Sequence, residues 1–283
     1  MPLPRPLAWI LAVLVAAAAL TACHDSTSSS PGPSDEQAAA IGTTAQYQVE
    51  ASLNTLTLPT LLVPIGEGPP CATPSTATDS DGDGIPNDAT YEFTSPPCHF
   101  TGFRGGTLDV VGQLRMQDPT PSAAGFGYEA TFTVLRDTFT SGDGKTTYSV
   151  TRNGGATLTG STAGLFLSTD LQVARTFTGQ PDAAVDEHWT VTYIPETPLQ
   201  INQPIPAGTL DVSGTLDWTR GTETFSLTVT TPTPLHYAAC TDTAQRFDAG
   251  ELRATGTFDG TTGYIRVRWS ECDKNPEVRF VAQ

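Results

Sequence analysis

The sequence has little basic charge and is rich in residues that disfavour helices. Only two lysines occur, Lys145 and Lys274, and 30 acidic residues against 14 Lys+Arg give a formal net charge of -16. Nucleic-acid binding needs clustered Lys and Arg to neutralise phosphates, so we exclude that class of function. The 283 residues include 46 threonines, 26 glycines and 23 prolines, and these three types disfavour helix interiors. A helical bundle or a coiled coil is therefore excluded as well.

Recognisable catalytic motifs are also missing. The chain has no G-x-S-x-G nucleophile elbow, no H-E-x-x-H zinc motif and no glycine loop of the phosphate-binding type. The densest group of acid–base residues is Asp186-Glu187-His188-Trp189, where strand spacing puts Glu187 and Trp189 on one face and His188 on the other. We interpret this group as the solvated start of a strand and expect no enzymatic activity. A hydrolase that uses paired carboxylates is the alternative, because sequence alone does not select two of the 30 acids.

The long apolar run of the chain lies at its N-terminus. Residues 7–20 are uninterrupted apolar residues behind Arg5, and they lead into Leu20-Thr21-Ala22-Cys23. This layout is typical of a secretory signal, and the run is short for a membrane span. The last four residues resemble the lipobox of bacterial lipoproteins. The resemblance implies that residues 1–22 are a removable signal peptide and that Cys23 becomes an acylated N-terminus; an ordinary secretory signal with a chance cysteine is the alternative.

The residues after Cys23 predict a tether and a location. In the lipoproteins of proteobacteria, Asp directly after the cysteine retains the protein at the inner membrane, and His24 stands there instead. The resemblance thus implies a cell-envelope protein that is anchored to a membrane through Cys23, with the outer membrane favoured. Residues 23–46 are rich in Ser, Pro, Gly, Ala and Asp, so we expect a flexible, disordered tether. A short helix around residues 35–41 would be marginal on its own.

Four cysteines remain after Cys23, namely Cys71, Cys98, Cys240 and Cys272. An even number in an exported chain indicates two disulfides, and three pairings are possible. We favour the two local pairings, Cys71 with Cys98 and Cys240 with Cys272, because each brackets one stretch of turn or hairpin. A zinc site is the competing interpretation, but no CxxC or paired-His spacing accompanies these cysteines.

The rest of the chain alternates apolar and polar residues with period two, which is typical of half-buried antiparallel strands. Three segments share one pattern, GTLDVVGQL at 106–114, GTLDVSGTL at 208–216 and GELRATGTF at 250–258, through either duplication or convergence. Each has an inward glycine at mid-strand, Gly112, Gly214 or Gly256, which predicts a bend or a close backbone approach. Further strands are expected at residues 47–53, 128–136, 146–152, 189–193, 225–230 and 264–269, and hairpin turns at 141–144, 153–155 and 259–263.

These patterns predict an all-β fold in which residues 47–283 form one large, curved antiparallel meander. A barrel, a half-barrel and a sandwich remain open as its architecture. Two smaller β-domains that divide near residues 180–185 are the second interpretation.

One internal motif indicates a ligand. Asp79, Asp81 and Asp83 stand at alternate positions, and Gly84 follows at the sixth position, where a sharp turn lets carboxylates converge. The segment resembles the calcium loops of thrombospondin type 3 repeats and of EF-hand-like loops. The resemblance implies Ca²⁺ bound by the three aspartates and the carbonyl of Ile85. Asn87 stands at the ninth position, where it offers an amide oxygen or holds a water.

The motif departs from its pattern at the twelfth position, where Thr90 replaces the expected acid. Asp88 is one substitute ligand and Glu92 is another, although neither spacing is regular. A weak site within a structural calcium loop at 79–90 is the prediction, and an acidic turn without metal is the alternative.

Three classes of function follow from these features. The leading hypothesis is a lipid-anchored envelope protein that acts as a non-enzymatic binding or structural module toward an envelope protein, a glycan or a hydrophobic ligand. The second is a carrier whose curved sheet holds a lipid or another hydrophobic ligand, an analogy that rests on fold class alone. The third is the carboxylate-based hydrolase. A carrier requires an open apolar cavity on the concave face of the sheet, whereas a module has a filled core.

Overall fold

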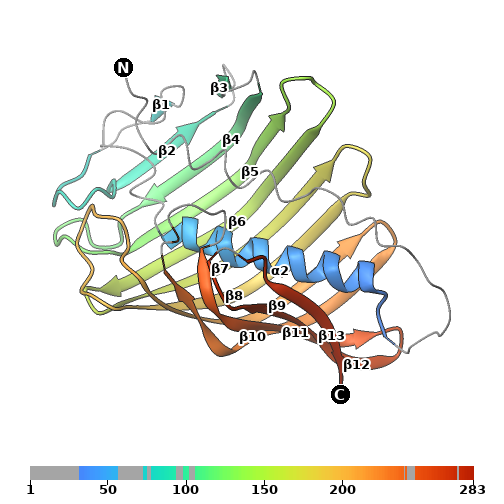
Figure 1. The fold of residues 1–283 in the computed structure, drawn as a ribbon. Coiled ribbons are helices and arrows are strands. Elements are labelled where there is room, and N and C mark those ends of the chain that lie inside the picture. The colour runs from blue at the N-terminus through green and yellow to red at the C-terminus, as the bar shows by residue number, and fades with distance from the viewer. Residues whose placement is uncertain are drawn as a thin grey trace.

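The computed structural model describes residues 32–56, 73–74, 78–93, 98–101, 106–238, 240, 246–272 and 274–283. These residues form one 13-stranded antiparallel sheet and one helix, α2 (Asp35–Leu56). The strands follow one another in chain order, except that β3 pairs with β4 beside β2. Figure 1 shows this meander with α2 lying across it. The predicted curved all-β meander is confirmed.

The strands are β1 (Thr73–Pro74), β2 (Asp88–Glu92), β3 (Cys98–Thr101), β4 (Thr107–Gln117), β5 (Tyr128–Thr140), β6 (Thr147–Ser161), β7 (Gly164–Phe177), β8 (Ala183–Pro195), β9 (Gly208–Arg220), β10 (Glu223–Tyr237), β11 (Phe247–Phe258), β12 (Thr261–Trp269) and β13 (Glu277–Ala282). β8 begins within residues 180–185, and it is paired with β7 from its first residue to Tyr193. The division into two β-domains is therefore wrong.

The mid-strand glycines lie at close backbone approaches, as predicted. Gly112 in β4 has a φ of 109°, and a Cβ there would clash with the carbonyl of Val134 at a register shift between β4 and β5. A Cβ on Gly214 would clash with the carbonyl of His188. Irregularities of this kind bend a sheet and increase its twist. The turn expected at 153–155 is wrong, because those residues lie inside β6.

Helix α2 corrects the prediction for residues 35–56. The strand at 47–53 is wrong, and the tether expected to extend to residue 46 gives way to helix at Asp35. A capping box starts the helix: the amide of Gln37 donates to Oγ of Ser34, and the amide of Ser34 donates to Oε1 of Gln37. Its buried residues recur every three to four positions, which is helix spacing; they are Ala38, Ile41, Gly42, Thr44, Ala45, Gln48, Val49, Ser52, Leu53 and Leu56.

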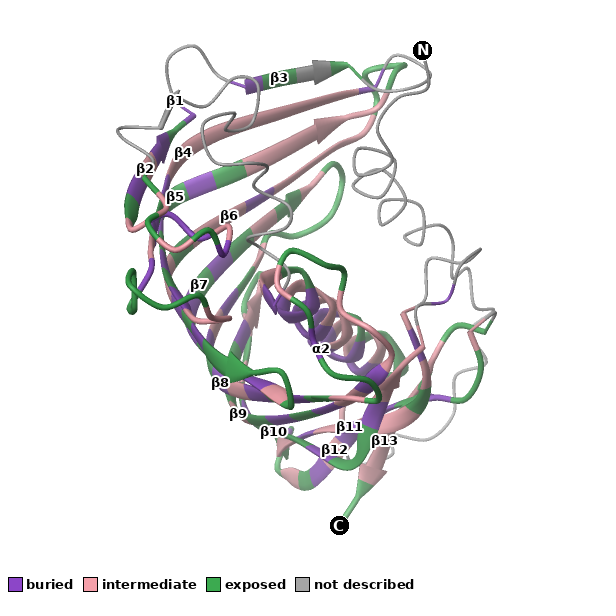
Figure 2. Ribbon diagram, turned by 90° about the vertical axis from the view of Figure 1, so that its left-hand side faces the viewer, coloured by how far each residue is buried: buried purple, intermediate pink, exposed green. Residues whose placement is uncertain are grey.

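The helix packs on the concave side of the sheet. Figure 2 shows the strands curling around α2, with buried residues along the helix and the strands. The apolar side chains of α2 and those of the inward strand faces form one core cluster. Polar contacts fix the helix in place as well: Nε1 of Trp218 donates to Oγ1 of Thr44 at 3.3 Å, and Nε2 of Gln37 donates to Oε1 of Glu223 at 2.7 Å.

Disulfide bonding agrees with the local pairing where the structure describes it. Cys240 and Cys272 are bonded to each other, with their Cα atoms 5.6 Å apart. Cys98 is disulfide-bonded too. Cys71, its predicted partner, lies outside the described residues, as do Cys23 and the predicted signal peptide. Within the described residues, no helix combines the length and the apolar character that crossing a membrane requires.

Candidate functional site

The acidic loop brings together three of its predicted ligands. Asp79, Asp81 and Asp83 each offer a carboxylate oxygen, and these oxygens lie within 4.8 Å of one another. Calcium binds oxygen at about 2.3–2.6 Å, so two ligands on opposite sides of the ion stand about 5 Å apart. The spacing of the three carboxylates therefore suits one calcium ion.

Backbone hydrogen bonds hold the loop in this shape. Asp79 accepts from the amides of Gly82 at 2.7 Å and Gly84 at 3.0 Å. Gly84 has a φ of 91°, and a Cβ there would clash with Oδ1 of Asn202. The predicted requirement for glycine at the sixth position thus has two causes, the left-handed backbone and the close approach of the β8–β9 connection.

The other predicted ligands have different surroundings. Ile85 is buried in the core, and its amide donates to Oδ1 of Asp83 at 2.8 Å. The side chain of Asn87 is hydrogen-bonded to Ser80 at 3.1 and 2.7 Å, where it closes the base of the loop. Asp88 opens β2 and accepts from Nε and Nη2 of Arg115 at 2.9 and 2.7 Å, so it does not join the three aspartates.

Asp118 is an acid of this region that the sequence analysis missed. It follows β4 directly, and its amide donates to the carbonyls of Pro86 at 3.0 Å and Asn87 at 3.3 Å. The side chain is 6% exposed. Its Oδ1 accepts from the amide of Thr120 at 2.7 Å, whereas its Oδ2 is buried without a hydrogen-bond partner. The pairing of β2 with β4 brings this residue to the loop, and no linear spacing encodes that pairing.

The loop buries negative charge. Asp83 is 3% exposed, and burial raises the pKa of its carboxyl. Hydrogen bonds from the amides of Gly125 and Ile85 oppose this rise, whereas the charges of Asp81 and Asp118 add to it. Oδ2 of Asp81 is also buried without a partner. Buried carboxylates are ordinarily paired with a cation or bound to a metal, so these groups fit the calcium that the motif implies.

A second group of charged residues lies between α2 and the sheet. Glu187 in β8 is 3% exposed, which corrects its interpretation as a solvated residue. Nε2 of Gln48 donates to Oε2 of Glu187, and Oε1 of Gln48 accepts from Nη2 of Arg175. The guanidinium of Arg175 also lies over the ring of Tyr47, 4.0 Å from its centre. One glutamine of the helix thus bridges an acid and a base of the sheet.

A cavity of about 230 Å³ adjoins this group. Its charged lining residues are Glu50, Asp137, Arg152, Glu187 and Arg246. Burial raises the pKa of Glu187 to about 7, although the hydrogen bond from Gln48 opposes the rise. Burial raises the pKa of Glu50 as well. The cavity therefore combines charges of both signs with carboxyls that hold their protons more strongly than usual.

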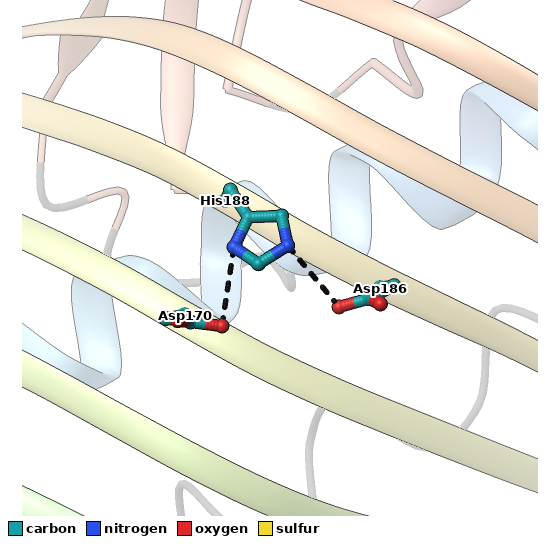
Figure 3. A group of neighbouring side chains, drawn as sticks. All are labelled: Asp170, Asp186 and His188. Carbon is teal, nitrogen blue, oxygen red and sulfur yellow. Dashed lines mark ion pairs between the residues drawn. The ribbon is translucent and has the colours of Figure 1, made fainter.

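A third group lies on the face of the sheet opposite to Glu187. His188 stands between Asp170 and Asp186, with Nδ1 3.1 Å from Asp170 and Nε2 3.5 Å from Asp186 (Figure 3). The side chains of Asp170, Asp186 and His188 are 78%, 42% and 54% exposed. The prediction that His188 points away from Glu187 and Trp189 is confirmed. Both ring nitrogens already face carboxylates, as ordinary surface ion pairs do.

The class that these features define is a curved antiparallel meander with a helix on its concave face and an acidic loop at one end. No family model matches the chain, and neither the curated proteins nor the solved structures include a significant match. The function is therefore argued from the site alone.

Proposed function

We propose that this chain is a lipid-anchored cell-envelope protein whose sheet acts as a non-enzymatic binding or structural module, with calcium bound by the acidic loop. The observation that carries the proposal is the packing of α2 on the concave face, where the helix and the strands form one core. A carrier of hydrophobic ligands needs a sizeable apolar cavity. The cavity beside α2 holds about 230 Å³, less than the roughly 300–1,000 Å³ of ligand pockets, and its lining mixes apolar side chains with five charged ones, which favours a module over a carrier.

The lipobox-like segment supports the anchoring. Two or three acyl chains, at about 0.8 kcal/mol per buried methylene, are enough for stable attachment. Because α2 begins at Asp35, the folded part follows Cys23 closely, and an acylated Cys23 would hold the sheet near a membrane surface. The outer membrane remains the favoured location on the identity of His24.

The test uses the full-length chain expressed in a bacterial host with radiolabelled palmitate. We expect label in the wild type and in the control Asp25→Ala, and none in Cys23→Ala, which should appear in the soluble fraction. Label in Cys23→Ala would contradict the anchor. Lipid extraction of the purified protein tests the module: a stoichiometric, non-covalently bound lipid would contradict it and favour the carrier.

A second candidate function, a carboxylate-based hydrolase, is favoured by one observation. Glu50 and Glu187, both with a raised pKa, line the same cavity, and a raised pKa suits a general acid. Hydrolysis of 4-nitrophenyl glycosides between pH 4 and 8 tests it. Activity that is lost in Glu187→Gln and kept in Asp186→Asn, a neighbouring acid on the opposite face, would support the hydrolase. Wild-type protein that releases no nitrophenol from these substrates would count against it.

A further inference from the structure

The calcium motif within residues 79–90 lacks one strong ligand. Thr90, at the twelfth position, lies in β2. The two acids nearest to it in the sequence have other partners: Asp88 accepts from Arg115, and Glu92 accepts from Nε2 of Gln113. A loop that relies on residues 79–85 alone offers three carboxylates and one carbonyl. Calcium prefers six to eight oxygens, and further carboxylates raise its affinity.

We propose that Asp118 is the fourth carboxylate ligand of this calcium site, so that the site is assembled from two separate segments of the chain. This inference rests on the calcium site of the proposed function. The acid missing from the linear motif is then supplied by the residue that directly follows β4. In the pairing of β2 with β4, Asp88 lies opposite Gln117. This register places the next residue, Asp118, beside the loop.

The surroundings of Asp118 support this role. The side chain is 6% exposed, and its amide is fixed by the carbonyls of Pro86 and Asn87, where the loop leads into β2. Of its two carboxylate oxygens, Oδ1 is engaged by Thr120 and Oδ2 is buried without a partner. Removing a carboxylate oxygen from water without a compensating partner is costly, and a bound cation offsets that cost.

Asp118 lies near the three aspartates without belonging to their tight group. Asp118 lies outside the group whose oxygens are within 4.8 Å of one another, and its charge acts on Asp83, the most buried member. Oδ2 of Asp81, a second member, is likewise buried and unpartnered. The two orphaned oxygens thus come from the two segments that the ion would join.

Calcium bound in this way would couple two connections of the sheet. Asp83 also accepts from the amide of Gly125 at 3.0 Å, in the connection between β4 and β5 that Asp118 begins. The ion at Asp118 and the hydrogen bond from Gly125 to Asp83 would together fix both parts of that connection to the loop. We therefore expect calcium to protect residues 118–127 from proteases as well as the loop itself.

The test compares three variants of the full-length chain, purified in detergent. Binding of ⁴⁵Ca²⁺ is measured by equilibrium dialysis for wild type, Asp79→Asn, Asp118→Asn and Asp88→Asn. Asp88→Asn removes the same charge from a nearby acid that is bound to Arg115 and serves as the matched control. We expect Asp118→Asn to weaken binding about 10- to 100-fold, Asp79→Asn at least as much, and Asp88→Asn less than threefold.

Thermal unfolding separates a ligand from a residue that merely holds a turn. Asparagine keeps Oδ1 for the amide of Thr120 and removes the buried charge. In EDTA we expect Asp118→Asn to melt at or above the wild-type temperature, and in 10 mM calcium to melt below it. An equal lowering of Tm in both buffers would overturn the proposal. Asp118→Ser, which also keeps an oxygen for Thr120, repeats the comparison should the asparagine variant fold poorly.

Different results would overturn the role of Asp118 and the calcium site itself. Calcium binding that is lost in Asp79→Asn but unchanged in Asp118→Asn would overturn the role of Asp118 and leave the loop as the calcium site. Wild-type protein that binds no calcium at 10 mM would overturn both.

Discussion

Two parts of the molecule bury carboxylates and compensate them in opposite ways. Between α2 and the sheet, Glu187 receives a hydrogen bond from Gln48, and Gln48 also binds Arg175. In the acidic loop, Asp81 and Asp118 each keep a buried oxygen without a partner, and Asp83, which accepts from two backbone amides, also feels the charges of Asp81 and Asp118. The first group is hydrogen-bonded to other side chains, although burial still raises the pKa of Glu187, whereas the second has buried carboxylate oxygens that a bound cation would satisfy.

This contrast between the two groups distinguishes a buried carboxylate that positions an element of the fold from buried carboxylates that suit a ligand. A compensated carboxylate specifies how α2 sits on the sheet, because Gln48 must meet both partners. Buried carboxylate oxygens without a partner destabilise a fold, and a bound cation would offset that cost. Burial alone does not distinguish the two groups, since Glu187 and Asp83 are both 3% exposed.

The largest expected effect concerns the pH dependence of stability. Burial raises the pKa of Glu187 from 4.5 to about 7, so the folded state holds an extra proton between these values. The free energy of unfolding should therefore fall by about 3 kcal/mol as pH rises from about 4.5 to 7, and the contribution should be constant above and below that window.

Urea unfolding of wild type and Glu187→Gln between pH 4 and 8 measures this contribution. The stability of the variant relative to wild type should rise by about 3 kcal/mol across the window. His236, whose pKa is raised by hydrogen bonds to Glu196 and Asp248, titrates in both proteins and cancels in the difference. If the stabilities of wild type and variant changed in parallel with pH, the pKa of Glu187 would not be raised in the folded state.

Removing the cation of the same group should cost somewhat less. In Arg175→Met, Oε1 of Gln48 loses its donor and Tyr47 loses the guanidinium over its ring. We expect a loss of about 2 kcal/mol in the free energy of unfolding at pH 7, because Glu187 can take up a proton and relieve part of the cost. The control Arg268→Met, at an exposed position of β12, should change stability by less than about 0.5 kcal/mol. Equal effects of the two substitutions would contradict a compensating role for Arg175.

The sequence predicts the strands well because their evidence is local. Alternation along each strand and the mid-strand glycines Gly112 and Gly214 need no knowledge of distant residues. Apolar periodicity did not identify helix α2, because Val49, Ala51 and Leu53 fit an alternating pattern as well as a helical one. The capping box of Ser34 and Gln37 was the local signal that distinguishes the two.

The candidate sites show the same difference between local and long-range evidence. Asp79, Asp81 and Asp83 are predictable because one turn brings them together. The face of Glu187 was predicted correctly, but its burial depends on Gln48, which is 139 residues away in the chain. Asp118 reaches the loop only through the pairing of β2 with β4. Strand pairing over such a separation is a property of the whole fold, and a linear motif does not contain it.

The smallest effect, that of calcium on stability, tests the other half of the comparison. The loop motif predicts a weak site, and an ion at ten times its Kd should raise the free energy of unfolding by about 1.4 kcal/mol. The increment should be the same in wild type and in Arg175→Met, because the charged group beside α2 and the acidic loop share no hydrogen bond among the described residues. Urea unfolding with calcium or EDTA measures both increments. A calcium increment that disappears in Arg175→Met would mean that the two groups of carboxylates are coupled through the sheet, and that the loop is not stabilised independently.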